Sequence, residues 1–237
     1  MYRFQTQLYP IYDFAIANEE VAKLDLEEYF PCCGKSSCGG CVHSFRKSES
    51  IFTCPFCKSE RGNKTDEEQV EELLKRVEAN DPASICLLAN IYYRGEGGLQ
   101  QDQVKAMELF TKSAELGFSK AHNNLGKVYY QRGDLKKTNF HYEAAAIAGH
   151  ELARFAVGIM DEESENMERA AKHLRIAAST GDYNAMHHLR KSFEFGYISR
   201  ESINSTLIAY NSYCAEMRSE ARDAYITNLS TYVEYYD

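Results

Sequence analysis

The sequence has no continuous apolar run that approaches the roughly 20 residues needed by a membrane-spanning helix. Its opening stretch, MYRFQTQLYPIYDFAIANEE, also lacks the basic flank and uninterrupted apolar segment of a secretory signal. We therefore expect an intracellular protein, located in the cytoplasm or the nucleus. In such a reducing compartment, cysteines spaced as Cys-x2-Cys pairs indicate metal ligands and not disulfides.

An excess of positive charge and recognisable catalytic motifs are also missing. The formal net charge is −8, which argues against general binding to nucleic acid. There is no nucleophile elbow, and no His-Glu-x-x-His pair occurs. The glycine-rich stretch RGEGG (94–98) lacks the Lys-Ser/Thr of a phosphate-binding loop. The sequence therefore predicts no catalytic residue, no membrane contact and no nucleic-acid partner.

Four segments share one pattern of small and apolar residues. They are SICLLANIYY (84–93), AHNNLGKVYY (121–130), ARFAVGIMDE (153–162) and AMHHLRKSFE (185–194). Each begins with a small residue and has an apolar residue four positions later. The next position is small in the first three segments and is Arg190 in the fourth. This spacing predicts four related helices that approach their neighbours closely at the small positions.

A second helix is expected in three of these units. The segments AMELFTKSAELG (106–117), TNFHYEAAAIAG (138–149) and AAKHLRIAASTG (170–181) align without gaps. Each ends on a glycine, the residue that most readily supplies a left-handed helix cap. The array resembles the Sel-one-like repeat, a relative of the tetratricopeptide repeat. That resemblance implies an all-α, right-handed helical-repeat solenoid over residues 82–196.

Six of the eight cysteines lie between residues 32 and 57. Two Cys-x2-Cys pairs are among them, Cys38–Cys41 and Cys54–Cys57, with twelve residues between the pairs. Zinc takes four tetrahedral ligands, and a Cys-x2-Cys pair supplies two of them from one tight turn. The pattern therefore predicts a zinc site, and its candidate ligands are Cys32, Cys33, Cys38, Cys41, Cys54 and Cys57.

The order of these cysteines resembles the second half of a RING-type zinc finger, in which eight ligands bind two zinc ions. The first Cys-x2-Cys pair of a RING is missing, because residues 1–30 contain neither cysteine nor histidine. The resemblance implies that the second RING site is complete, with the ligands Cys32, Cys33, Cys54 and Cys57. The alternative is a single rearranged site with the ligands Cys38, Cys41, Cys54 and Cys57. In both cases we expect one zinc ion per chain.

The expected division of the chain is an N-terminal segment (1–30), a RING-like zinc finger (31–64), a capping helix (65–81), the repeats (82–196), and closing helices with a tail (197–237). Thr65 and Glu68 are expected to form a capping box at the start of the capping helix. Because each repeat packs mainly on its neighbours, removal of the metal is expected to unfold the finger and leave the helical stack intact.

The combination of finger and array resembles a group of RING-plus-repeat proteins found in microalgae. Helical-repeat stacks usually bind peptides or proteins on a concave face, which favours a zinc-binding adaptor. On that hypothesis Asn90, Lys127 and His187 belong to the partner surface. The alternative is a RING-type ubiquitin ligase, in which the repeats select the substrate and the finger recruits a ubiquitin-conjugating enzyme. Pro55 and Phe56 would then line one side of the docking groove for that enzyme.

Overall fold

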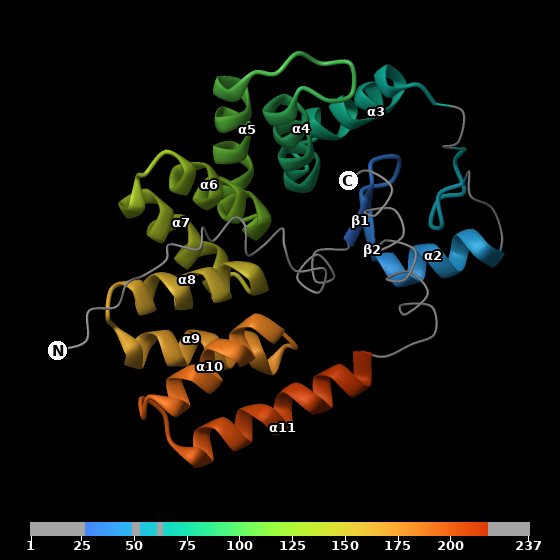
Figure 1. The fold of residues 1–237 in the computed structure, drawn as a ribbon. Coiled ribbons are helices and arrows are strands. Elements are labelled where there is room, and N and C mark those ends of the chain that lie inside the picture. The colour runs from blue at the N-terminus through green and yellow to red at the C-terminus, as the bar shows by residue number, and fades with distance from the viewer. Residues whose placement is uncertain (1–26, 49–52, 61–63, 218–237) are drawn as a thin grey trace, which may run out of the picture.

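The computed structural model describes residues 27–48, 53–60 and 64–217 of the 237-residue chain. Within these residues, two short strands and one helix come first, and a curved stack of helices follows (Figure 1). The stack runs from α3 to α11, and the small N-terminal module lies beside α3 and α4 at its beginning. Helices make up 71% of the structure, which confirms the expected helical solenoid.

The N-terminal module is built on a β-hairpin. Strands β1 (Glu27–Phe30) and β2 (Lys35–Cys38) pair antiparallel, with Phe30 opposite Lys35, and helix α2 (Gly39–Ser48) follows β2 directly. Phe30, Val42 and Cys54 form its buried apolar cluster. A core of this size is small, and domains this short usually need a metal or disulfides to fold.

The repeat helices alternate along the stack. The first helices of the four units are α4 (Pro82–Arg94), α6 (Ser119–Gln131), α8 (Glu151–Glu163) and α10 (Tyr183–Glu194). The second helices are α5 (Gln103–Glu115), α7 (Leu135–Ile147) and α9 (Met167–Ser179). Consecutive helices pack on one another throughout. The four expected first helices and three expected second helices are all present.

Small residues allow the two helices of a unit to approach closely. A Cβ atom on Gly126 of α6 would lie 2.6 Å from Cδ1 of Tyr142 on α7. A Cβ atom on Gly158 of α8 would lie 2.8 Å from the Leu174 side chain on α9. Real side chains do not tolerate such distances, so glycine at these two positions fixes how the large residue opposite is packed.

The helix ends follow the local signals in the sequence. Gly117, Gly149 and Gly181, each the residue after the C-cap of a second helix, have φ angles of 85°, 88° and 87°. L-residues with a side chain rarely adopt this left-handed conformation, so glycine ends each helix cleanly. Helix α3 (Asp66–Glu78) precedes the repeats and begins with the expected capping box between Thr65 and Glu68.

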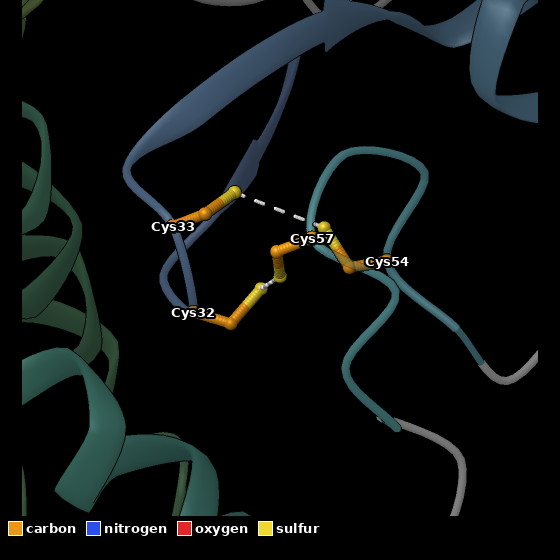
Figure 2. Close-up of side chains that lie close together, drawn as sticks. All are labelled: Cys32, Cys33, Cys54 and Cys57. Carbon is orange, nitrogen blue, oxygen red and sulfur yellow. Dashed lines mark hydrogen bonds between the residues drawn. The ribbon is translucent and has the colours of Figure 1, made fainter.

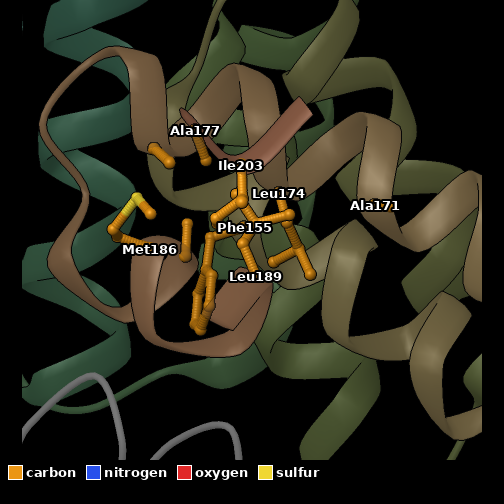
Figure 3. Close-up of a cluster of buried hydrophobic side chains, with 9 residues drawn as sticks. Phe155, Ala171, Leu174, Ala177, Met186, Leu189 and Ile203 are labelled. Atoms are coloured by element: carbon orange, nitrogen blue, oxygen red, sulfur yellow. The ribbon is translucent and has the colours of Figure 1, made fainter. Parts of the chain in front are cut away.

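Among the described residues, the apolar cluster with the most buried side chains lies at the C-terminal end of the stack. Phe155 of α8, Leu174 of α9, Leu189 of α10 and Ile203 of α11 (Arg200–Met217) meet there (Figure 3). Helix α11 packs against both α9 and α10, and so covers the end of the last unit. Within the part of the chain that the structure describes, no helix combines the length and the apolar character that crossing a membrane requires.

Candidate metal centre

The turn between β1 and β2 carries two of the predicted ligands, Cys32 and Cys33. The backbone N–H groups of Cys33 and Gly34 both donate to the carbonyl oxygen of Phe30, at 3.2 and 2.9 Å. Gly34 has a φ of 70°, which lets the chain reverse immediately after the two cysteines. The hairpin therefore holds two adjacent thiols at its tip.

A second turn carries Cys54 and Cys57. The N–H of Cys54 donates to the Ser59 carbonyl at 2.9 Å, and the N–H of Lys58 donates to the Cys54 carbonyl at 3.0 Å. Lys58 has a φ of 59°, a left-handed conformation in which the chain curls back around the Cys54 and Cys57 thiols. Cys54 is fully buried and Cys57 is exposed.

The two turns bring four sulfur atoms together (Figure 2). The Sγ atoms of Cys33 and Cys54 are 3.8 Å apart, and those of Cys32 and Cys57 are 3.6 Å apart. All four Sγ atoms lie within 4.8 Å of one another. Zinc–sulfur bonds of about 2.3 Å in a tetrahedron place the sulfur atoms about 3.8 Å apart. The spacing therefore fits one tetrahedral metal ion, and these four residues are called the cysteine cluster below.

The thiols of the cluster differ in acidity. The Ser59 hydroxyl, 3.2 Å from the Cys57 sulfur, and the Ser59 N–H lower the pKa of Cys57 to about 6. Burial raises the pKa of Cys32 to about 12 and also raises the pKa of Cys33. Near neutral pH the cluster thus contains one thiolate ready to bind a metal and two thiols that must release protons to do so.

The other Cys-x2-Cys pair is Cys38 and Cys41, and among the described side chains it contributes none to the cluster. Cys38 is the last residue of β2, where its backbone pairs with Glu27, and its side chain lies outside the described residues. Cys41 lies in α2 with an exposed side chain. Its spacing from Cys38 resembles a metal-binding turn, but the chain between them passes from strand to helix.

The residues expected on the partner surface lie on the first helices of their units. Asn90 of α4 accepts a hydrogen bond from Asn124 of α6 at 3.4 Å, which links two successive units. Lys127 occupies the position in unit two that corresponds to Asn90 in unit one, whereas His187 lies one turn earlier in unit four. Cys86 is buried next to this contact, and its sulfur accepts a hydrogen bond from the Asn124 amide at 3.6 Å.

Sequence reasoning missed one pair of histidines. His122 of α6 and His141 of α7 lie with their Nδ1 atoms 3.0 Å apart, and the ring of Tyr129 stacks on His141. The two histidines are at unrelated repeat positions, so only the packing of α6 on α7 brings them together.

Comparison with known proteins identifies the repeats. The Sel1 repeat family model matches residues 82–118, 119–150 and 153–182. Helices α4 to α9 of the stack therefore match three Sel1 repeats. These ranges start and end close to the helix pairs α4–α5, α6–α7 and α8–α9. No RING family is found for the chain, so the RING resemblance of its N-terminal module rests on the cysteine pattern alone.

The known proteins that are similar to this one include one plant protein and two bacterial proteins. An F-box protein of Arabidopsis thaliana is 28% identical over 109 residues, which are 45% of this chain and 31% of the relative. This chain thus matches about a third of that relative's length. A Sel1 repeat protein from Oxalobacter formigenes superposes with a TM-score of 0.55 at 20% identity, covering 77% of this chain and 73% of that one. A protective antigen of uropathogenic Escherichia coli with an SLR fold gives 0.51 at 21% identity, covering 82% and 44%. At such identities the two structures show the fold alone.

Proposed function

We propose that this chain is a protein-interaction adaptor whose N-terminal module binds one structural zinc ion through the cysteine cluster. Sel1 repeats support the adaptor role, because proteins built from them act as interaction scaffolds. The observation that carries the zinc proposal is the set of four sulfur atoms within 4.8 Å of one another. They come from two turns that are 21 to 25 residues apart in the sequence.

A zinc ion held by four thiolates has a structural role. Its coordination is closed, so no position remains for a water molecule that could be activated for hydrolysis. The ion would join the β-hairpin to the loop around Cys54, across a module whose buried apolar cluster is small. Metal binding then supplies folding energy that the apolar core cannot.

Elemental analysis of protein produced with zinc in the medium tests the metal site. We expect one zinc ion per chain in the wild type. Cys32→Ser and Cys57→Ser should abolish stoichiometric binding, whereas Cys41→Ser, an exposed control, should retain it. Loss of zinc in Cys41→Ser, with retention in Cys32→Ser, would instead favour the rearranged site that includes Cys38. Two zinc ions per chain would contradict the proposal.

Capture of partners by the full-length chain tests the adaptor role. The half-buried Lys127, on a first helix, belongs to the proposed partner surface. Lys136 is exposed on the second helix of the same unit and makes a matched control. Lys127→Glu should reduce the recovery of specific partners, and Lys136→Glu should not. Equal recovery with both variants would refute the proposed surface.

Ubiquitin ligase activity is a second candidate, favoured by one observation on the module's surface. The ring of Phe56 is 40% exposed and lies edge-on against Phe30, with ring centroids 5.6 Å apart. An apolar side chain presented next to Pro55 suits one side of a docking groove. Because no first Cys-x2-Cys pair supplies the other side, we expect weak or no ubiquitin-chain formation. Robust activity that is lost in both Phe56→Ala and Cys57→Ser would replace the adaptor role with the ligase role.

A further inference from the structure

The hairpin that carries Cys32 and Cys33 is attached to the first repeat by the half-buried Tyr29. The hydroxyl of Tyr29 on β1 donates to Oδ2 of Asp81 and lies 2.6 Å from Oγ of Ser84 on α4. Burial and the hydrogen bond to Asp81 raise the pKa of Tyr29 to about 12, so its hydroxyl stays protonated and remains a donor. The strand and the repeat helix are 52 residues or more apart in sequence.

Asp81 serves the module and the repeat at the same time. Its Oδ1 atom caps helix α4 by accepting the N–H of Ala83 at 3.0 Å, while its Oδ2 atom accepts the Tyr29 hydroxyl. Ser84 stands where the other three units have alanine. The hydroxyl that distinguishes this unit from the others faces Tyr29, so the departure from the repeat pattern lies at the contact with the module.

Arg76 makes a second attachment, directly at the ligand-bearing turn. From helix α3 its Nε atom donates to the carbonyl of Pro31 at 3.1 Å, and its Nη2 atom donates to the carbonyl of Cys32 at 3.2 Å. A Cβ atom on Gly34 would lie 3.3 Å from Nη1 of Arg76, so the guanidinium sits tightly against the turn. Four thiolates and one zinc ion carry a net charge of −2, and a nearby cation stabilises that charge.

We propose that Tyr29 and Arg76 couple the cysteine cluster to helices α3 and α4, so that metal binding stabilises these two helices as well as the module. This inference rests on the proposed zinc site. Arg76 is then a positioning residue, which holds the Cys32 carbonyl and thereby orients the turn that carries two ligands. A metal ion bound by the Cys32 and Cys33 thiolates would hold this turn in place, and so would the hydrogen bonds from Arg76. Metal binding and the Arg76 contacts therefore strengthen each other.

The contacts change the expectation that the stack is indifferent to the metal. If the module unfolds without zinc, Asp81 loses the Tyr29 hydroxyl and Arg76 loses both carbonyl acceptors. These groups all lie at the α3–α4 junction, so the loss of these hydrogen bonds should destabilise α3 and α4 before the rest of the stack. Helices α9 and α10 pack at the other end of the stack and provide an internal reference.

Hydrogen–deuterium exchange of the full chain, with zinc and after treatment with EDTA, tests this coupling. In the wild type, zinc should slow the exchange of α4 amides, around Ile85–Ala89, by at least about tenfold. Exchange in α9 and α10 should not change. Tyr29→Phe removes only the hydroxyl, and Arg76→Met removes the guanidinium; each should reduce the effect of zinc on α4. Lys75→Met, at an exposed neighbour on the same helix, is the matched control.

The outcomes separate this inference from the proposed function. A wild type that binds one zinc ion but shows unchanged α4 exchange overturns the coupling and leaves the zinc site standing. A wild type that binds no zinc overturns both. Arg76→Lys keeps the positive charge but lacks the planar group that donates to both carbonyls. Its zinc affinity should therefore lie between those of Arg76→Met and the wild type. Affinity equal to the wild type in Arg76→Met would refute its positioning role.

Discussion

The ring of Tyr142 lies against the backbone of Gly126, and no Cβ atom fits between them. Such a Cβ atom would lie 2.6 Å from Cδ1 of Tyr142, which is closer than side chains allow. Tyr142 is itself 2% exposed and has Ala145, Ala146 and Ala153 in its buried cluster, so it has little space to move away.

Replacement of Gly126 by leucine should therefore destabilise the stack. Overpacking at this contact is expected to lower the free energy of unfolding by about 1–3 kcal/mol. Chemical denaturation followed by circular dichroism measures the change. Lys136→Leu adds a similar side chain at an exposed position of the facing helix and should have little effect. A Gly126→Leu protein as stable as the wild type would mean that α6 and α7 do not pack as described.

The ion pair of Arg169 and Asp161 gives a second prediction. Asp161 replaces the tyrosine found at the equivalent positions 92 and 129, and its side chain is 8% exposed. Arg169 Nη1 binds its Oδ1 atom at 2.9 Å, and no hydrogen-bond partner is found for the other oxygen among the described residues. Arg169 thus neutralises a carboxylate that is largely withdrawn from water.

Arg169→Met should leave that carboxylate without its counter-ion. We expect a loss of about 1–3 kcal/mol, less than for a fully buried pair because Arg169 is 39% exposed. Lys172→Met, on the same helix, breaks only a surface pair with Glu168 and should leave the unfolding midpoint unchanged. Similar midpoints for the two variants would argue against a structural role for the buried pair.

The repeats could be predicted from the sequence because their signals are local. Small residues such as Gly126 and terminal glycines such as Gly149 recur at fixed spacing, and each acts within one helix pair. The same reasoning overlooked strand β1, which is acidic and short, and helix α2, whose Gly-Gly start is typical of a turn. In both cases tertiary packing outweighs the local preference.

The cysteine cluster could be predicted only as one of two ligand sets. Spacing favours Cys38 and Cys41 as a pair, because any Cys-x2-Cys can form a metal-binding turn. The hairpin tip at Cys32 and Cys33 depends on pairing between β1 and β2, which the alternation of residues does not reveal. Tyr29 and Arg76 contact residues that are farther away in the sequence, so these contacts could not be predicted. The only sequence signal was Ser84, which stands where the other units have alanine.

The stability of the stack should depend on the protonation of His141. Burial, and then the charges of His122 and Lys137, lower the pKa of His141 to about 4, below its ordinary value of 6.5. The unfolded chain therefore binds a proton first as the pH falls, and folding stability decreases between about pH 6.5 and pH 4. His141→Phe keeps a ring against Tyr129 and should lose less stability than the wild type between pH 7.5 and pH 5. Parallel losses in both proteins would assign the pH dependence to other groups.

Zinc affinity should rise steeply with pH, since the cluster must lose protons to bind. Burial raises the pKa of Cys32 to about 12 and also that of Cys33, so both thiols release a proton on binding near neutral pH. The logarithm of the association constant should increase by at least about 2 per pH unit between pH 7 and pH 8.

Cys57 adds one further proton only at lower pH, because the hydrogen bonds from Ser59 lower its pKa to about 6. The slope should therefore steepen as the pH falls through that value. Ser59→Ala removes the hydroxyl donor, raises the pKa of Cys57 and should move the steep region to higher pH, whereas Ser44→Ala, at an exposed position on α2, should not. Competition with a chromophoric chelator from pH 5.5 to pH 8 measures all three curves. An affinity that does not vary with pH would mean that the metal does not displace thiol protons, and so is not held by the cysteine cluster.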